Sequence, residues 1–368
     1  MAIHVAGLDV KRFRGIKDLS LQNLNHINII AGDNNSGKTS ILEAIHLLKD
    51  PAGLYNLFRT AVMRENGKLI SVLSFFDSFL NMLPKDSYEI EIEAYGDKVG
   101  EIVIELKGEI REILLDKKSL SSLMQKRVAK YDIAEIETTA YIGLYECAID
   151  NNVVKYPIEF TSYTEFTRLP RSKYDTINIS YLAPSRHLTG NNIDNIVKSP
   201  SYKDLCIYLL KLFDEDIEDV LYTKHDLYNK PIENIMHKTL GIMPLSTYGD
   251  GIKKVISLAN GIASAKDGIL MIDEVETSIH KKYYKDIFAF LIKACQQYNV
   301  QLFLTTHNQE AMDTFLDIQD YIGDKHIEDR LSVITFRNDK DSGKTLSRIL
   351  QGNEVKRNRD NFNFEVFI

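Results

Sequence analysis

The chain has 368 residues, of which 44% are hydrophobic and 26% charged, with a formal net charge of −7 and a pI of about 5.8. This length supports one elaborated domain or two smaller ones. The acidic balance gives the whole molecule no reason to bind polyanions, so any nucleic-acid contact must be local. The sequence has no run of about 18 apolar residues and no secretory signal pattern, so we expect a cytoplasmic protein without a membrane partner.

The N-terminal part of the chain predicts strands followed by helices. Alternation and a short apolar run predict three strands within residues 4–32. A glycine-rich loop follows, and the apolar side chains after it recur at helical spacing until Pro51 and Gly53. Residues 54–83, rich in Leu, Phe and Met, favour further helix.

The middle of the chain combines strand and helix patterns. Strict alternation in "YEIEIEAYG" and "GEIVIELKGEIREILLD" predicts an antiparallel β-meander with one solvated face, whereas residues 117–175 fit both helix and strand. The segment at 201–222, "SYKDLCIYLLKLFDEDIEDVLY", predicts one amphipathic helix. We therefore expect a β-meander and helical insertion at 54–180 and a helical subdomain at 185–245.

The C-terminal half contains short apolar runs closed by polar residues. "GILMIDE" and "VQLFLTTH" have the pattern of strands buried on both faces of a parallel sheet, and "DTINISYLAPSR" predicts a buried strand that ends at Pro184. Residues 330–350 predict a hairpin across the turn "DKDSG", within a C-terminal hairpin and tail at 312–368. Cys147, Cys206 and Cys295 lie far apart without metal-ligand spacing, so we expect three buried thiols.

A phosphate-binding loop is predicted at Gly32–Thr39, because "GDNNSGKT" fits GxxxxGK[ST] between a predicted strand and a predicted helix. Lys38 would reach the β- and γ-phosphates of ATP, and the Thr39 hydroxyl would bind Mg²⁺. The predicted ATP-binding residues are Gly32, Asn34, Asn35, Ser36, Gly37, Lys38, Thr39 and Ser40. A second "DSGKT", at 341–345, has Asn338 where the first glycine would stand and predicts a hairpin turn.

Two carboxylates follow the apolar run "GILMI". Asp273 is the predicted second Mg²⁺ ligand, acting through water, and Glu274 is the predicted catalytic residue that polarises the attacking water. "STYGDG" at 246–251 precedes this pair and opens a predicted helix, and "THN" closes the next buried strand with His307.

This order of motifs resembles that of ABC-type ATPases. With "FRGIKDLSLQNLNHINIIAGDNNSGKTSILEAI", "YLAPSR", "ILMIDEVETSIH" and "LFLTTHN", the chain resembles the RecF/Rad50/OLD branch, and in particular the bacterial AAA-family ATPases without a Toprim domain that occur in anti-phage systems such as PARIS. The resemblance implies a single α/β head over residues 1–368. Its fold would be a P-loop NTPase of the ABC type with a mixed sheet, an antiparallel meander and a helical insertion.

The resemblance also implies roles for residues outside the phosphate loop. His307 would be a catalytic switch histidine that senses the γ-phosphate, and Ser246, Gly249 and Gly251 would form a signature segment that contacts the nucleotide of the opposite subunit. A lone subunit would then lack a complete site, so the family pattern implies a homodimer or higher homo-oligomer. Arg186 could contact nucleotide or form a surface salt bridge.

Several companion domains found in related families are not expected here. Sustained heptads are missing, and the 61 residues after His307 (368 − 307) are too few for a Toprim domain. The Asp339 and Asp341 pair is interpreted as a solvated turn. We expect ATP hydrolysis by a sensor or scaffold that works with a separately encoded nuclease or toxin in anti-phage defence.

A RecF-like DNA-binding clamp is the alternative. Its footprint would be the basic stretches "KRFR" at 11–14, "HKKYYK" at 280–285 and "KRNR" at 356–359. A transporter ATPase fits the meander poorly, and a metabolic P-loop kinase would not need the signature segment.

Overall fold

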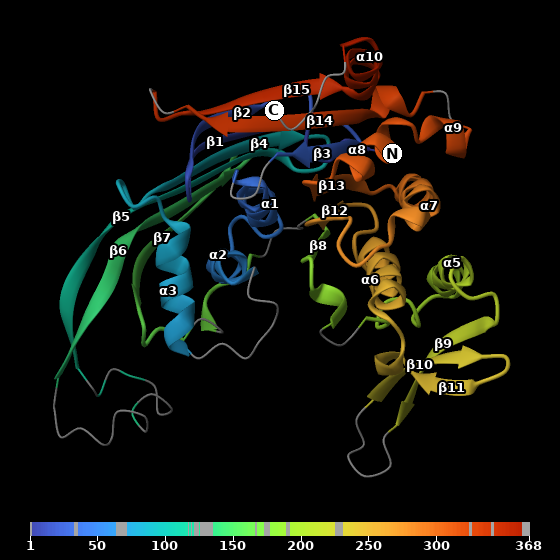
Figure 1. Cartoon of the computed structure of the whole chain (residues 1–368). Helices are drawn as coiled ribbons and strands as arrows, with labels where there is room; N and C mark the ends of the chain where they lie inside the picture. The colour runs from blue at the N-terminus through green and yellow to red at the C-terminus, as the bar shows by residue number, and fades with distance from the viewer. Residues whose placement is uncertain are drawn as a thin grey trace.

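The computed structural model describes residues 2–32, 36–63, 72–116, 118, 120, 125, 135–165, 168–172, 177–188, 192–224, 231–323, 326–339 and 342–362. The predictions for Asn34 and Asn35, for Asp341 and for most of 117–134 lie outside these ranges. Figure 1 shows the chain as a central mixed sheet flanked by a curved antiparallel sheet on one side and by helices and a small sheet on the other.

The central sheet is built from short apolar strands. They are β3 (Ile27–Ala31), β8 (Ile179–Leu182), β12 (Ile269–Ile272), β13 (Gln301–Thr306), β14 (Leu331–Asn338) and β15 (Thr345–Gln351). Their order is β15-β14-β3-β13-β12-β8, parallel except for the β14–β15 hairpin. Every residue of β3, β12 and β13 is buried, which explains why these strands have continuous apolar sequences. The predicted buried parallel strands and the C-terminal hairpin are confirmed.

The second sheet contains the predicted meander. Its strands are β1 (Gly7–Phe13), β2 (Ile16–Leu21), β4 (Ile90–Gly96), β5 (Gly100–Asp116), β6 (Glu135–Ile149) and β7 (Asn152–Thr161). They pair antiparallel in the order β2-β1-β4-β5-β6-β7. The ambiguous region 117–175 thus supplies two strands. The sheet packs against α1 (Lys38–Leu47), α2 (Leu54–Ala61) and α3 (Val72–Met82) in one apolar core.

The remaining helices pack on the other face of the central sheet. They are α5 (Pro200–Lys211), α6 (Asp250–Ser264), α7 (Tyr284–Gln297), α8 (Gln309–Leu316), α9 (Gln319–Ile322) and α10 (Gly352–Phe362). Short 3-10 helices at Arg186–Leu188 and Leu245–Thr247 precede α5 and α6, and a third at Lys281–Tyr283 precedes α7. Among the described residues no helix has the length and hydrophobicity needed to cross a bilayer.

The single helix predicted for 201–222 is wrong beyond Lys211. The chain turns at Asp214, whose carboxylate accepts a hydrogen bond from the Asp216 backbone N–H at 3.1 Å. It then forms a three-stranded antiparallel sheet of β9 (Ile217–Lys224), β10 (Pro231–His237) and β11 (Gly241–Pro244). The segment expected to be helical is therefore mixed, while the predicted domain boundaries stay predictions.

Two smaller predictions are confirmed. All three cysteine thiols are buried and free. The second "SGKT" segment is a hairpin turn: the Asp339 carboxylate accepts hydrogen bonds from the backbone N–H and the hydroxyl of Ser342, and Gly343 has a φ of 68°. Gly343 permits this left-handed conformation without steric cost.

A buried ion pair joins the β1–β2 turn to α1. The Glu43 side chain is 0% exposed, and the Arg14 side chain, 13% exposed, donates from Nη2 to Glu43 Oε1 at 2.8 Å. Arg14 also donates to the carbonyl oxygen of Asn81, in the last turn of α3, at 3.1 Å. Arg14 therefore connects the antiparallel sheet to α3 and to α1, the helix that follows the phosphate loop.

We predict that Arg14→Ala lowers the free energy of unfolding by about 3–5 kcal/mol, because it leaves the Glu43 carboxylate buried without its cation. Chemical denaturation measures the change. Arg12→Ala is the matched control, since Arg12 pairs with Glu89 and Glu91 at the surface and should contribute about 0–1 kcal/mol. Equal losses in the two variants would contradict the structural role of Arg14.

Candidate functional site

The described part of the phosphate loop has the backbone that phosphate binding needs. Gly32 and Gly37 have φ values of 154° and 104°, which side-chain-bearing residues rarely adopt. Lys38 begins α1, and its ammonium donates to the carbonyl oxygen of Gly32 at 2.7 Å. The Ser36 hydroxyl is buried without a hydrogen-bond partner among the described residues, so it can take one from a ligand. Ser40 is buried in the first turn of α1.

Asp273 is the centre of the site. It follows β12 and is buried, and its carboxylate accepts three hydroxyl hydrogen bonds. Thr305 donates to Oδ1 at 2.6 Å, whereas Thr39 and Tyr181 donate to Oδ2 at 2.9 and 3.2 Å. These donors come from β13, α1 and β8, so the carboxylate joins the phosphate loop to the ends of both strands beside β12.

Thr39 and Asp273 fit a Mg²⁺ ion. A hydroxyl and a carboxylate are the hard oxygen ligands that Mg²⁺ prefers, and their direct hydrogen bond shows that both face the same point. The structure therefore brings together the two residues predicted from the sequence to hold the metal.

Glu274 has a strained backbone. Its φ of 49° lies in the left-handed region that residues with a side chain seldom occupy. The Thr305 hydroxyl accepts a hydrogen bond from the Glu274 N–H at 2.8 Å, and the Thr277 hydroxyl donates to Glu274 Oε2 at 3.2 Å. These bonds fix the carboxylate directly beside Asp273, as a residue that orients water requires.

His307 is held by Glu276. Oε1 of Glu276 accepts a hydrogen bond from the His307 backbone N–H at 3.0 Å and lies 3.2 Å from the ring Nδ1. Glu276 is buried, whereas 42% of the His307 side chain is exposed. The histidine thus follows β13 with its backbone held by Glu276, while part of its ring is open to solvent. The His280 side chain caps a 3-10 helix, because it accepts a hydrogen bond from the Lys282 N–H.

The predicted signature segment forms no hydrogen bond with these residues in the part of the chain that the structure describes. Ser246 belongs to a short 3-10 helix, Gly249 precedes α6, and Gly251 lies in its first turn. Ser246 and Gly249 are exposed. The small sheet β9–β11, from which the chain enters α6, lies at the bottom right of Figure 1, away from β3 and α1. The segment is therefore presented outward rather than to the phosphate loop of its own chain.

The basic stretches are largely neutralised by neighbouring carboxylates. In the first stretch Lys11 pairs with Glu93 at 2.9 Å, and Arg12 pairs with Glu89 and Glu91. Arg14 forms its ion pair with Glu43. In the second stretch Lys281 pairs with Glu310, while Lys282 and Lys285 lie over the rings of Tyr283 and Tyr321. In the third, Lys356 pairs with Glu328 and Arg359 with Asp317.

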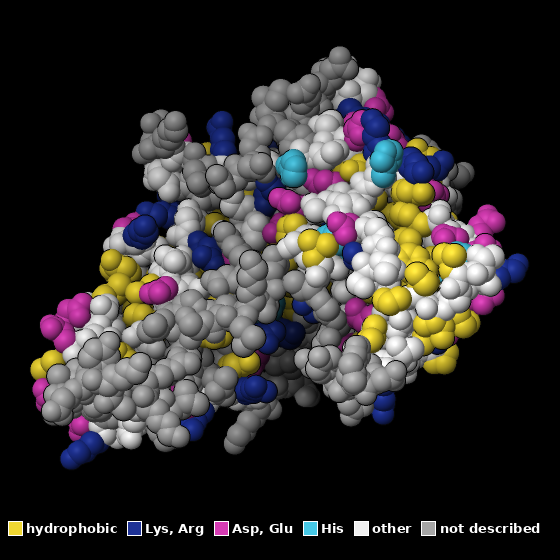
Figure 2. Space-filling model, turned by 60° about the horizontal axis from the view of Figure 1, so that its bottom comes forward, with side chains coloured by type: hydrophobic (Ala, Val, Ile, Leu, Met, Phe, Trp, Pro, Cys, Tyr) yellow, Lys and Arg dark blue, Asp and Glu magenta, His cyan; other side chains and the backbone are white. Residues whose placement is uncertain are grey.

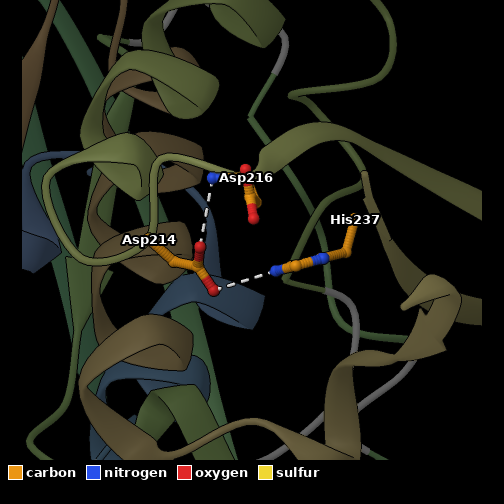
Figure 3. A group of neighbouring side chains, drawn as sticks. All are labelled: Asp214, Asp216 and His237. Carbon is orange, nitrogen blue, oxygen red and sulfur yellow. Dashed lines mark hydrogen bonds and ion pairs between the residues drawn. The ribbon is translucent and has the colours of Figure 1, made fainter. Parts of the chain in front are cut away.

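A second group of possible metal ligands lies beside β9 and β10. Asp214, Asp216 and His237 offer ligand atoms within 4.8 Å of one another (Figure 3). Nδ1 of His237 faces the backbone N–H groups of Thr239 and Leu240, each at 3.2 Å, so this nitrogen is the acceptor. Nε2 then carries the proton and donates to Asp214 at 3.1 Å. The Asp214 carboxylate and both ring nitrogens of His237 therefore have partners, and these bonds close the turns at the ends of the small sheet.

Sequence reasoning missed Thr305 and Tyr181. Both stand at the carboxyl ends of buried strands, where ligands of open α/β sheets bind, and this position was the available signal. The contact between Glu276 and His307 was also not foreseen.

Comparisons with known proteins match the chain to ATPase families. Residues 4–240 match the family model described as "AAA ATPase domain", and residues 224–313 match "AAA domain, putative AbiEii toxin, Type IV TA system". The chain is 23% identical to an ATP/GTP phosphatase of Helicobacter pylori, over 86% of this chain and 88% of that protein.

Other similarities are partial or limited to overall shape. The chain is 47% identical over 58 residues to the DNA replication and repair protein RecF of Nitrosococcus oceani, which covers 16% of this chain and 15% of RecF. A crystal structure of the SmcHead bound to the C-winged helix domain of ScpA aligns with a TM-score of 0.48 at 12% identity, covering 96% of this chain and 99% of that one.

We predict that Glu274→Gln retains ATP binding but slows hydrolysis by about a hundredfold or more, because the amide cannot polarise the attacking water. Lys38→Ala should instead abolish ATP binding, since the loop loses its contact with the β- and γ-phosphates. Titration with a fluorescent ATP analogue and a phosphate-release assay separate the two effects. Unchanged turnover in Glu274→Gln would remove this residue from the catalytic role.

Proposed function

The chain belongs to the AAA ATPase domain family and is an ATPase, and from this premise we propose that it dimerises around ATP and Mg²⁺ as a cytoplasmic sensor or scaffold for a separate effector protein. The dimer is the unit of a homo-oligomer. The effector is a nuclease or toxin, and the biological setting is bacterial anti-phage defence.

The outward position of the signature segment carries the proposal of a dimer. Ser246, Gly249 and Gly251 open a helix whose N–H groups can bind phosphate, yet none of them makes a contact that joins it to the described phosphate loop of its own chain. A second copy placing this segment over the nucleotide would complete both sites. The dimer would then close only around bound nucleotide.

The chemistry of the site follows from its contacts. Lys38 would neutralise the β- and γ-phosphates, and Thr39 and Asp273, which face one another, would hold Mg²⁺. The bound ion would supply charge stabilisation to the transferred phosphoryl group. Glu274 orients the attacking water. His307, fixed through Glu276, contacts the γ-phosphate and distinguishes ATP from ADP.

The role in defence is supported by the family matched at residues 224–313, whose description names a putative AbiEii toxin and a type IV toxin–antitoxin system. That description belongs to the family, and its extension to this chain is our proposal. The partner protein would dock on the region 54–175 or on the C-terminal segment 312–368. Its activity would change when a foreign trigger alters the ATPase cycle.

A RecF-like clamp remains the second candidate because of the partial RecF similarity. The basic stretches that would bind DNA are paired with carboxylates, which argues against this alternative. Among the coloured residues on the face drawn in Figure 2, Lys and Arg side chains are dispersed among Asp and Glu and form no single continuous patch.

We predict that ATP hydrolysis requires residues from two chains. Gly251→Asp places negative charge where the partner's γ-phosphate would bind, so this variant and Lys38→Ala should each be inactive alone. Mixed together, they form heterodimers in which one of the two composite sites has an intact phosphate loop and an intact signature. Recovery of phosphate release would follow, and its absence in verified heterodimers would contradict the arrangement in trans.

We predict that a second protein co-purifies stoichiometrically from the native operon, and that Glu274→Gln, which accumulates the ATP-bound form, increases its retention. Mass spectrometry identifies the partner and light scattering gives the stoichiometry. A lone ATPase that binds DNA with a steep salt dependence would favour the clamp instead.

A further inference from the structure

Lys254 is a buried cation that has no hydrogen-bond partner among the residues that the structure describes. It lies on the inner face of α6, its side chain is among the largest fully buried ones, and only 2% of the residue is exposed. Its ammonium forms no hydrogen bond or ion pair within the described residues. Leaving a buried charge unsatisfied costs stability, so a residue of this kind needs a compensating role in another state of the molecule.

The surroundings of Lys254 identify what it acts on. Three carboxylates attract its ammonium, in decreasing order Glu276, Asp273 and Glu274. Burial lowers the pKa of Lys254 to about 8, against the opposing effect of these carboxylates, so the ammonium keeps its charge at neutral pH. Lys254 thus belongs to the charge cluster of the ATPase site although no motif includes it.

One carboxylate oxygen of Glu276 is also buried and has no hydrogen-bond partner among the described residues. Oε1 of Glu276 holds both the backbone N–H and the ring of His307, so the oxygen without a partner is Oε2. Two buried groups of opposite charge, on α6 and on the loop after β12, are therefore both unsatisfied. A direct ion pair between them would satisfy both.

The position of Lys254 along α6 indicates when this change would occur. Gly251, in the predicted signature segment, precedes Lys254 by three residues, which is about 4.5 Å along the helix axis. A contact made by the first turn of α6 therefore lies within one helical turn of Lys254. The same helix then reaches the signature segment at one end and the Glu276–His307 pair on its inner face.

We propose that Lys254 is a positioning residue that transmits signature engagement to His307. When the first turn of α6 meets the partner's nucleotide, the ammonium pairs with Oε2 of Glu276, and Glu276 fixes His307 against the γ-phosphate. This inference rests on the proposed dimer. It adds a route by which one subunit's signature contact activates the hydrolysis site within that same subunit.

The test compares Lys254→Met, which keeps the length of the side chain but removes its charge, with Lys253→Met. Lys253 lies next to it on α6 and pairs with Asp250 at the surface. We expect Lys254→Met to lower kcat by about tenfold, the size of coupling that contacting residues show, with ATP binding and Tm maintained. Lys253→Met should retain the original kcat, and Lys254→Arg should restore most of it.

A double-mutant cycle with Glu276→Gln separates positioning from a structural effect. If Lys254 acts through Glu276, the double variant loses no more activity than the worse single variant. Additive losses, or a normal kcat in Lys254→Met, would overturn the inference. In the Glu274→Gln background with Lys254 intact, failure to dimerise on ATP addition would instead contradict the proposed dimer, so the two failures are distinguishable.

Discussion

The buried carboxylate of Asp273 is the interaction on which the site depends. A buried charge is tolerated only when its oxygens are satisfied, and here three hydroxyl groups satisfy them from α1, β8 and β13. The carboxylate therefore fixes the distance between the phosphate loop and the edge of the central sheet. Because Glu274 follows directly, with its N–H bonded to the same Thr305 hydroxyl, the proposed catalytic residue takes its backbone position from the Asp273 site.

The strands of the central sheet were predictable because burial on both faces leaves continuous apolar runs. The strand β9 was not. Its buried residues Ile217 and Val220 are three positions apart, a spacing that a helix produces equally well. What makes it a strand is pairing with β10, where Val220 lies opposite Ile235. Local periodicity contains no information about that partner.

The same limit applies to the candidate site. The phosphate loop and the Asp273–Glu274 pair follow from a contiguous motif, whereas Tyr181 and Thr305 become neighbours of Asp273 only through the strand order β13-β12-β8. Glu276 and His307 come from different loops that meet at this edge. Sequence reasoning named His307 through its position after a buried strand but not the carboxylate that orients it.

Charge distribution connects the site to association. Asp273, Glu274 and Glu276 follow β12 beside the predicted phosphate loop, and Lys38 and Lys254 are two cations close to these groups. Further positive potential in the proposed dimer comes from the N-terminus of α6 of the second copy, through backbone N–H groups that are already oriented and need no reorganisation. Stabilisation of the transferred phosphoryl group would then depend on the second subunit. In this arrangement the γ-phosphate of ATP would hold the two subunits together. Because hydrolysis removes this group, hydrolysis and dimerisation would be coupled.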